Sequence, residues 1–594
     1  MKFKKHLPLL LALLPALTCG LLLLSPLRKT SASSEDKAFT DFTRELFCSQ
    51  ITSNTLTLHY TLSNPAAFGI EDAPVTLGLY SPEGEALSSA VPENTREALH
   101  SFSRNKLSAS NQLTYDILSY QLEQELHMSS FRYYEEIFSP TLGIQAQLPI
   151  LLAEYTFRCE QDIEDYLDLL EQLDSYYASL LNYQQEKAAA GLFMSDETAD
   201  TVIAQCREFI SNPSSHFLLS TFEERLAQAD FLTEEAKSDY LNSNRALVFG
   251  HVFPAYELLI DGLSKLKGSG TNDYGLGYYD QGCDYYEAWV SCTTGTGRTM
   301  PEIIQLMEEQ MTTDLQTITS IVAEHPELLK TTSYTIDSQE PLYILETLEE
   351  RMQADFPSAS SASCQVKYVD PSLEEYLSPA FYLTPPLDRM EEHVIYINPS
   401  GNYDSLSLFT TLAHEGYPGH LYQTLYENSC NPDPVRNLFY FGGYVEGWAT
   451  YAEHCSYAYT NLDSDLAALL SANSFLSLGL HARADVGIHY EGWTPEGLAD
   501  FLAGYGITNQ NTIHTMYQAI LQDPGNYLKY YLGAAEILQL KKQAEATLGD
   551  AFVLKDFHEF LLSAGAAPFP VLESWLETWL TNQERAPHRQ HPFR

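Results

Sequence analysis

The chain has 594 residues, of which 44% are hydrophobic, and its glycine and proline contents are ordinary, so it is a folded globular protein rather than a disordered one. This length exceeds what one hydrophobic core usually supports, so we expect two lobes or domains. The 79 acidic and 33 basic residues give a formal net charge of -46. A surface this acidic repels nucleic acids and anionic lipids, which excludes both as favoured partners.

The N-terminus has the pattern of an export signal. Three lysines among the first five residues precede an apolar run from Leu7 to Leu27. This run is long enough to cross a bilayer, since about 20 apolar residues suffice. Residues 1–30 are therefore predicted to be a cleaved signal peptide, a membrane anchor or, least favoured, a segment lipidated at Cys19. Each alternative places the body of the protein outside the cytoplasm, either secreted or anchored to the outer face of the membrane by this segment only.

The rest of the chain is predicted to be mainly helical. Apolar residues recur every three or four positions in segments such as 160–181, 195–210 and 233–263, and Pro254 predicts a kink or break in the last of these. Thr299, with Glu302 three residues later, predicts a capped helix start. No segment after the N-terminus is predicted to span a membrane.

Two short segments break the helical pattern. Residues 364–369 and 393–398 are rich in β-branched and aromatic side chains and are predicted to be strands of a small sheet. We therefore expect a polar linker at 31–36, a helical N-terminal lobe at 37–355, and a catalytic lobe at 364–590. The cysteines after residue 30 are scattered without a C-x-x-C pair, so they permit disulfides but do not indicate a zinc site.

Residues 406–423 contain the first candidate site. They begin as an amphipathic helix that includes His414, Glu415 and, six residues after the first histidine, His420. Zinc hydrolases commonly place two histidines four residues apart on one helix face, with a glutamate as base. A spacing of six places the second histidine roughly 120° away on an ideal helix. A metal site therefore requires a break at Pro418-Gly419; otherwise these are two hydrogen-bonded histidines at a helix end.

A second predicted helix supplies carboxylates. Glu446 and Glu453 are seven residues apart, so two helical turns bring them to the same face. Paired glutamates on a helix are usually solvated, but this helix follows the histidine helix at the distance expected of a helical hairpin. Two histidines and one glutamate around zinc leave a fourth position for water, which is the pattern of catalytic rather than structural sites.

Together these segments resemble a known family. Residues 414–423, HEGYPGHLYQ, and 446–453, EGWATYAE, match the pattern H-E-x-x-P-G-H-x-x-Q followed by E-G-W-A-x-Y-x-E of the domain-of-unknown-function 885 family of bacterial proteins. The resemblance extends to residues 487–493, 524–533 and 556–563. It covers the C-terminal half of the chain more completely than the N-terminal half.

The resemblance implies a mainly α, two-lobed metallopeptidase-like fold, similar to the thimet oligopeptidase and carboxypeptidase Taq type, with a central channel and a small sheet beside the metal helix. It implies one Zn²⁺ per chain, held by His414, His420 and Glu446. Glu415 would be the general base that acts on water activated by the zinc. The strand at 393–398 would hold an extended peptide, and short peptides would be the substrates because a channel excludes folded proteins.

Other residues have expected supporting roles. Tyr530 is a candidate for stabilising the oxyanion of the reaction, although a tyrosine that only packs is an equal alternative. Gln423 and Glu453 are expected to orient the metal ligands. Asp485 and His489 are expected either to orient ligands or to contact substrate.

The sequence leaves three functions open. The first is a secreted or surface-anchored zinc metallopeptidase of short peptides. The second is a metallohydrolase of another amide or of an ester, which would use the same chemistry. The third is a non-catalytic surface protein that binds peptides, but such a protein would need no general base at Glu415.

Overall fold

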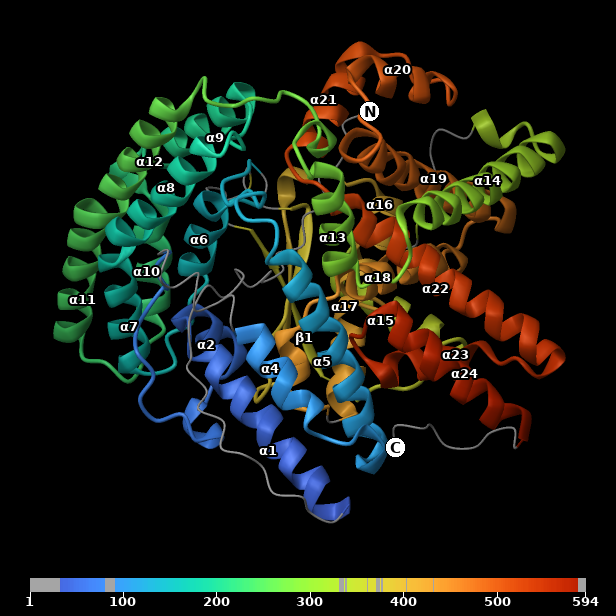
Figure 1. Cartoon of the computed structure of the whole chain (residues 1–594), viewed down its shortest axis with the longest axis horizontal. Coiled ribbons are helices and arrows are strands. Elements are labelled where there is room, and N and C mark those ends of the chain that lie inside the picture. Colours follow the sequence, from blue (N-terminus) through green and yellow to red (C-terminus); the bar gives the residue numbers. More distant parts are fainter. Residues whose placement is uncertain are drawn as a thin grey trace.

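The computed structural model describes residues 32–80, 91–140, 142–330, 336, 339–360, 362–369, 374, 378–401, 403–430 and 432–585. Within these residues the chain is mainly helical with one three-stranded sheet, as predicted (Figure 1). The predicted signal or anchor at 1–30 lies outside the described residues.

Residues 32–36, which belong to the predicted linker at 31–36, form the first turns of α1 (Ala32–Ile51). The carboxylate of Glu35 accepts hydrogen bonds from the Ser103 backbone N–H at 2.8 Å and from the Lys106 ammonium at 2.9 Å. These contacts hold the start of the helix against the body of the protein. The neighbouring helices are α2 (Thr55–Thr61), α4 (Val91–His100) and α5 (Ala109–Met128).

Seven helices lie together on one side of the molecule around a core to which α2 and the sheet region also contribute (Figure 1). The segment predicted as one helix at 160–181 is interrupted at Gln172, and the break predicted near Pro254 is a π-helical turn at Val248–Val252. The helices are α6 (Ile144–Ala153), α7 (Glu160–Glu171), α8 (Leu173–Ala189), α9 (Asp196–Phe209), α10 (Phe217–Ala227), α11 (Glu234–Leu247) and α12 (Phe253–Leu266).

The continuous helical segment Glu234–Leu266 is long and apolar enough to cross a membrane by length and composition alone. This differs from the sequence-based expectation that no such segment follows the N-terminus. Val252, Leu259 and Leu263 on it are fully buried, and α12 packs against α8 and α9. Core helices of folded lobes have the same composition, so the segment is weak evidence for a membrane span.

The small sheet contains β1 (Ser363–Tyr368), β2 (Ala380–Leu383) and β3 (Glu392–Ile397), in the order β1-β3-β2. β3 is parallel to β1 and antiparallel to β2. The prediction of β1 and β3 is confirmed to within one residue at each end, whereas the four-residue β2 was missed. The expectation that the strand at 393–398 holds a peptide is wrong, because both of its edges are already paired. β1 and β2 are the two edge strands.

The remaining helices form the largest core. It combines residues of α13 to α15 with those of α16 to α24, so it extends across the predicted boundary between the lobes, and that boundary stays a prediction. α14 begins with the predicted Thr299–Glu302 capping box. No cysteine in the described residues is in a disulfide. The helices are α13 (Gly282–Thr294), α14 (Met300–Glu324), α15 (Pro341–Arg351), α16 (Ser405–Glu415), α17 (His420–Ser429), α18 (Gly442–Ser456), α19 (Ser464–His489), α20 (Pro495–Ala503), α21 (Gln510–Leu521), α22 (Asn526–Leu548), α23 (Leu554–Ala564) and α24 (Phe569–Arg585).

Helices α18 and α22 lie in close contact through glycines. A Cβ atom on Gly447 would lie 2.4 Å from the carbonyl carbon of Gly533, and one on Gly533 would lie 2.1 Å from the carbonyl oxygen of Gly443. Only residues without a side chain allow two helix backbones to approach this closely. The contact holds Glu446 on α18 in a defined position relative to Tyr530 on α22.

We expect Gly533→Ala to lower the free energy of unfolding by about 1–3 kcal/mol, because the added methyl group overlaps backbone atoms that cannot move aside. Chemical denaturation measures this change. The control is Gly250→Ala, where no atom lies within 4 Å of the added Cβ and little change is expected. Equal stability of the two variants would contradict the assigned packing.

Candidate metal centre

The helix that carries His414 is interrupted just before His420. α16 ends at Glu415, and the backbone then leaves the helical conformation at Gly416 and Gly419 before α17 begins. The Gly419 N–H donates to the Ala413 carbonyl at 2.9 Å, so the connecting turn folds back onto the end of α16. A Cβ on Gly419 would lie 1.8 Å from the carbonyl oxygen of His414. This turn therefore requires glycine, and the predicted break is present.

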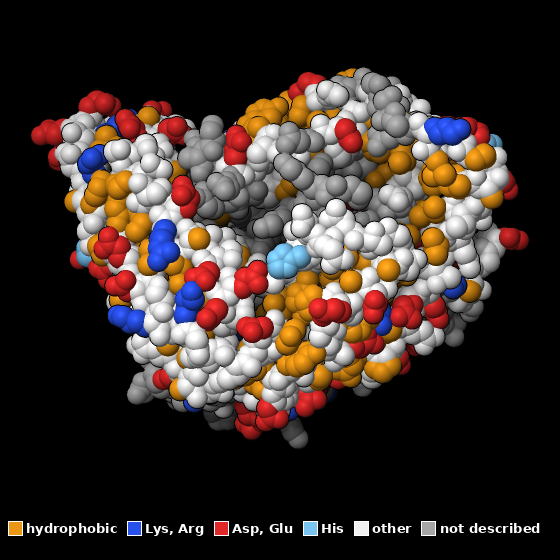
Figure 2. Space-filling model, turned by 90° about the horizontal axis from the view of Figure 1, so that it is seen from above, with side chains coloured by type: hydrophobic (Ala, Val, Ile, Leu, Met, Phe, Trp, Pro, Cys, Tyr) orange, Lys and Arg blue, Asp and Glu red, His pale blue; other side chains and the backbone are white. Residues whose placement is uncertain are grey.

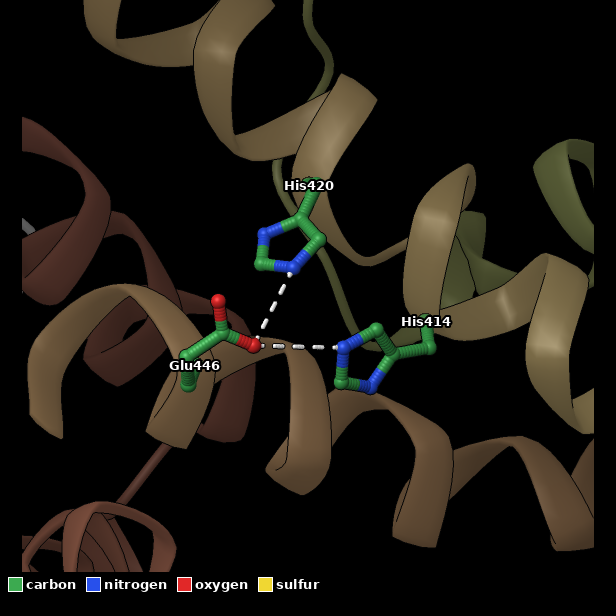
Figure 3. Close-up of side chains that lie close together, drawn as sticks. All are labelled: His414, His420 and Glu446. Carbon is green, nitrogen blue, oxygen red and sulfur yellow. Dashed lines mark ion pairs between the residues drawn. The ribbon is translucent and has the colours of Figure 1, made fainter. Parts of the chain in front are cut away.

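The break brings the candidate ligands together. The centroids of the His414 and His420 imidazole rings are 4.8 Å apart. The Nε2 atom of each ring lies 3.5 Å from Oε2 of Glu446 (Figure 3). One ligand atom from each residue lies within 4.8 Å of the others. Tetrahedral zinc with bonds of about 2.0–2.1 Å separates its ligand atoms by roughly 3.3–3.4 Å. The spacing of the three residues is therefore close to that of a zinc site.

The burial of the three candidate ligands also agrees with a metal site. All three side chains are buried, and Glu446 has no exposed surface. His420 Nε2 and Glu446 Oε2 have no hydrogen-bond partner, and buried polar atoms rarely stay unpartnered. Both atoms face the space between the three residues (Figure 3). No other group of three such ligands is found in the described part of the chain.

The charged groups of the centre shift one another's pKa values. Burial alone would lower the pKa of His414, but the neighbouring carboxylates of Glu446 and Glu453 outweigh burial and raise the pKa to about 10. Burial opposes ionisation of Glu446, yet His420 and His414 hold its pKa below the usual range. A metal-binding imidazole must be deprotonated, so a cation would compete with a proton for His414.

Two of the three candidate ligands, His414 and Glu446, have a second contact on their far side. Glu453 Oε2 lies 3.4 Å from Nδ1 of His414, so the opposite ring nitrogen, Nε2, points toward Glu446. The Tyr440 hydroxyl donates to Oε1 of Glu446 at 3.0 Å. Such outer contacts fix the orientation of metal ligands. Glu453 was expected to have this role, whereas Tyr440 was missed because it precedes α18 and follows no helical spacing.

Glu415 lies beside the ligands and is held by the sheet. Its Oε2 atom accepts a hydrogen bond from the backbone N–H of Tyr382 on β2 at 2.8 Å. Burial raises the pKa of Glu415, and the neighbouring His414 and His420 partly offset this effect. A buried carboxylate with a raised pKa next to a metal centre has the properties of a general base.

Tyr530 approaches the centre from α22. Its ring stacks on His414 with 6.2 Å between ring centroids, and its buried hydroxyl has no hydrogen-bond partner. Gln423 is also buried, on α17, and its Nε2 atom lacks a partner.

Asp485 and His489 contact other parts of the protein. Asp485 accepts hydrogen bonds from the Tyr286 hydroxyl at 2.6 Å and from the Gly525 N–H at 2.9 Å, directly before α22 begins. His489 accepts from the Leu276 N–H at 3.2 Å and contacts the Ile520 carbonyl at 3.0 Å. Asp485 therefore holds the start of the helix that carries Tyr530, and these contacts of His489 are to backbone groups rather than to metal ligands.

The role of His489 predicts a pH-dependent effect on stability. Burial lowers its pKa to about 4, whereas an unfolded histidine titrates near pH 6.5. Between pH 4 and pH 6.5 the unfolded chain binds a proton at His489 that the folded chain does not bind, so protonation favours unfolding. The free energy of unfolding of the parental protein therefore falls as the pH is lowered from 6.5 to 4. We expect His489→Gln to lower the free energy of unfolding by about 2 kcal/mol near pH 7.5, from lost hydrogen bonds and packing.

The difference in free energy of unfolding between the parental protein and His489→Gln should shrink toward pH 4, because the variant has no histidine to titrate at this position. Denaturation at several pH values measures the difference. The exposed His514, changed in the same way, provides the control. If the difference in free energy of unfolding stayed constant between pH 6.5 and pH 4, the assignment of a neutral, buried imidazole to His489 would be contradicted.

Comparison with known proteins agrees with these motifs. The family of bacterial proteins of unknown function called DUF885 matches residues 65–576. A candidate lipoprotein from Colwellia psychrerythraea has a similar structure, with a TM-score of 0.79 at 21% identity over 93% of this chain and 100% of that one. A candidate lipoprotein of unknown function from Shewanella oneidensis has a TM-score of 0.61 at 17% identity over 92% and 100%. No curated protein matches. Because the family match spans most of the sequence and includes the centre described above, this chain belongs to the DUF885 family.

Proposed function

We propose that this protein is a zinc-dependent hydrolase that cleaves short peptides outside the cytoplasm. The observation that carries the proposal is the convergence of His414, His420 and Glu446, whose ligand atoms lie within 4.8 Å of one another beside the buried Glu415. A structural site would use four protein ligands, whereas three ligands leave room for a reacting molecule. A buried carboxylate beside such a set has little use in a structural site.

The residues around the centre have complementary tasks. A zinc ion held there would supply a Lewis acid that polarises a carbonyl group and lowers the pKa of water. Glu415 takes a proton from the attacking water and returns it to the leaving nitrogen. Its bond to the Tyr382 N–H fixes one carboxylate oxygen, which orients the other. The unpartnered Tyr530 hydroxyl donates to the oxyanion that forms as the carbonyl is attacked.

A peptide substrate is supported by β2. This edge strand contacts Glu415 through Tyr382, so an extended chain pairing along the edge would pass beside the general base. In this proposal β2, rather than the strand at 393–398, would hold the peptide.

Export is supported by the apolar N-terminal segment and by the description of two similar structures as candidate lipoproteins. The face of the molecule seen in Figure 2 carries many acidic and few basic side chains. Nucleic acid is therefore a poor partner, and membrane attachment would use the N-terminal segment only.

The first test is the metal content of the purified protein. We expect one zinc ion per chain and its loss in His420→Ala, because two ligands no longer hold the ion tightly. The exposed His514→Ala is the matched control and should keep its zinc. Absence of zinc from the parental protein after zinc has been supplied would overturn the proposal.

The second test is Glu415→Gln, which keeps the shape of the side chain but removes the base. Hydrolysis of a library of short peptides, followed by mass spectrometry, should fall by about 10²–10⁴-fold while the zinc content stays unchanged. The exposed Glu234→Gln is the control. Undiminished turnover in Glu415→Gln would overturn the mechanism. Zinc-dependent cleavage of simple esters or other amides, with no peptide cleaved, would favour the alternative substrate class.

A further inference from the structure

Tyr440 contacts the candidate metal ligand Glu446 from outside the ring of ligands. It lies in the segment between α17 and α18, and its hydroxyl is 3.0 Å from Oε1 of Glu446. A carboxylate only accepts hydrogen bonds, so the phenol is the donor. The other oxygen of Glu446, Oε2, is the atom that lies 3.5 Å from each imidazole and has no hydrogen-bond partner.

The backbone around Tyr440 is closely packed, so this contact is part of the fold. The next residue, Phe441, is fully buried, and its ring packs edge-on against Tyr120 with 6.0 Å between centroids. Gly442 and Gly443 then begin α18. A Cβ on Gly443 would lie 2.3 Å from the carbonyl oxygen of Thr294, at the end of α13. The chain entering α18 is therefore pressed against α13, which fixes the position of Tyr440.

The two oxygens of Glu446 consequently have different environments. A glutamate can bind a metal through one oxygen or through both. When both oxygens bind, they occupy space that a water molecule or a carbonyl oxygen would otherwise take. A hydrogen bond from a fixed phenol to Oε1 favours binding through Oε2 alone, because turning Oε1 toward the metal would break that bond and leave the partly buried hydroxyl unpaired.

We propose that Tyr440 is a positioning residue that restricts Glu446 to metal coordination through Oε2 and so keeps a coordination position open for the reacting molecule. This assignment rests on the zinc centre of the proposed function. It gives the centre a matched pair of outer contacts, since Glu453 orients His414 through Nδ1 as Tyr440 orients Glu446 through Oε1. Tyr440 itself touches neither the metal nor the substrate.

The test is Tyr440→Phe, which removes only the hydroxyl. Zinc affinity is measured by competition with a chromophoric chelator, and the metal environment is measured from the visible spectrum of the cobalt-substituted protein. The matched control is Tyr451→Phe on α18, which also loses a buried hydroxyl contact, with His558 at 2.8 Å, but not one to a metal ligand. Any general loss of stability should be similar in the two variants.

We expect zinc affinity to fall by about 10–100-fold in Tyr440→Phe, the range found when an outer contact of a metal ligand is removed. The Tyr451→Phe control should stay within about twofold of the parental protein, because none of its lost contacts involves a metal ligand. Without the Tyr440 hydroxyl, both oxygens of Glu446 can bind the cobalt ion and raise its coordination number. Because cobalt absorbs visible light less strongly as its coordination number rises, the absorption should weaken in Tyr440→Phe and not in Tyr451→Phe.

The outcomes separate this inference from the proposed function. If the parental protein binds no zinc, the zinc centre itself is wrong. If the parental protein binds zinc but Tyr440→Phe keeps the same affinity, Tyr440 does not position Glu446. If affinity falls but the cobalt spectrum is unchanged, Tyr440 does not select a single oxygen, and the proposal is overturned in that part.

Discussion

The candidate centre depends on the close contact between Gly419 and the end of α16. The backbone of Gly419 lies so near the His414 carbonyl that no side chain fits, and this contact turns the chain between His414 and His420. A continuous helix would separate the two imidazoles around its circumference. Because the turn replaces about one turn of helix, α17 begins with His420 already beside His414. The short separation between the two imidazoles follows from this local interruption.

A second set of close contacts supplies the rest of the centre. α13, α18 and α22 meet through glycines, which leave no room for a side chain between their backbones. Glu446 and Tyr440 are placed by the start of α18, and Tyr530 is placed by α22, whose first turn is held by Asp485. The centre is thus built on helices that cannot slide past one another. This rigidity is what a site needs if its ligand atoms are to stay in position before the metal binds.

The electrostatic arrangement of the centre is consistent with this rigidity. A buried carboxylate is costly unless it has a charged partner, and Glu446 has two imidazoles within 3.5 Å. The candidate ligand set therefore combines one buried negative charge with two imidazoles that lie close enough to stabilise it. Glu415, whose pKa burial raises, has a different environment although it is adjacent to His414 in sequence. The two glutamates can accordingly have different tasks, one as ligand and one as base.

The sequence by itself predicted the helical class, the capping box at Thr299, the strands β1 and β3, and the candidate residues of the centre, because these follow from local periodicity and short motifs. It also showed that the six-residue spacing needed a break. Only the tertiary structure decided that β2 rather than β3 is the edge beside Glu415, that Asp485 and His489 hold backbone groups, and that Tyr440 contacts Glu446. The reason is physical: strand order, helix approach and contacts across a connecting segment arise from packing between distant residues, which local patterns do not encode.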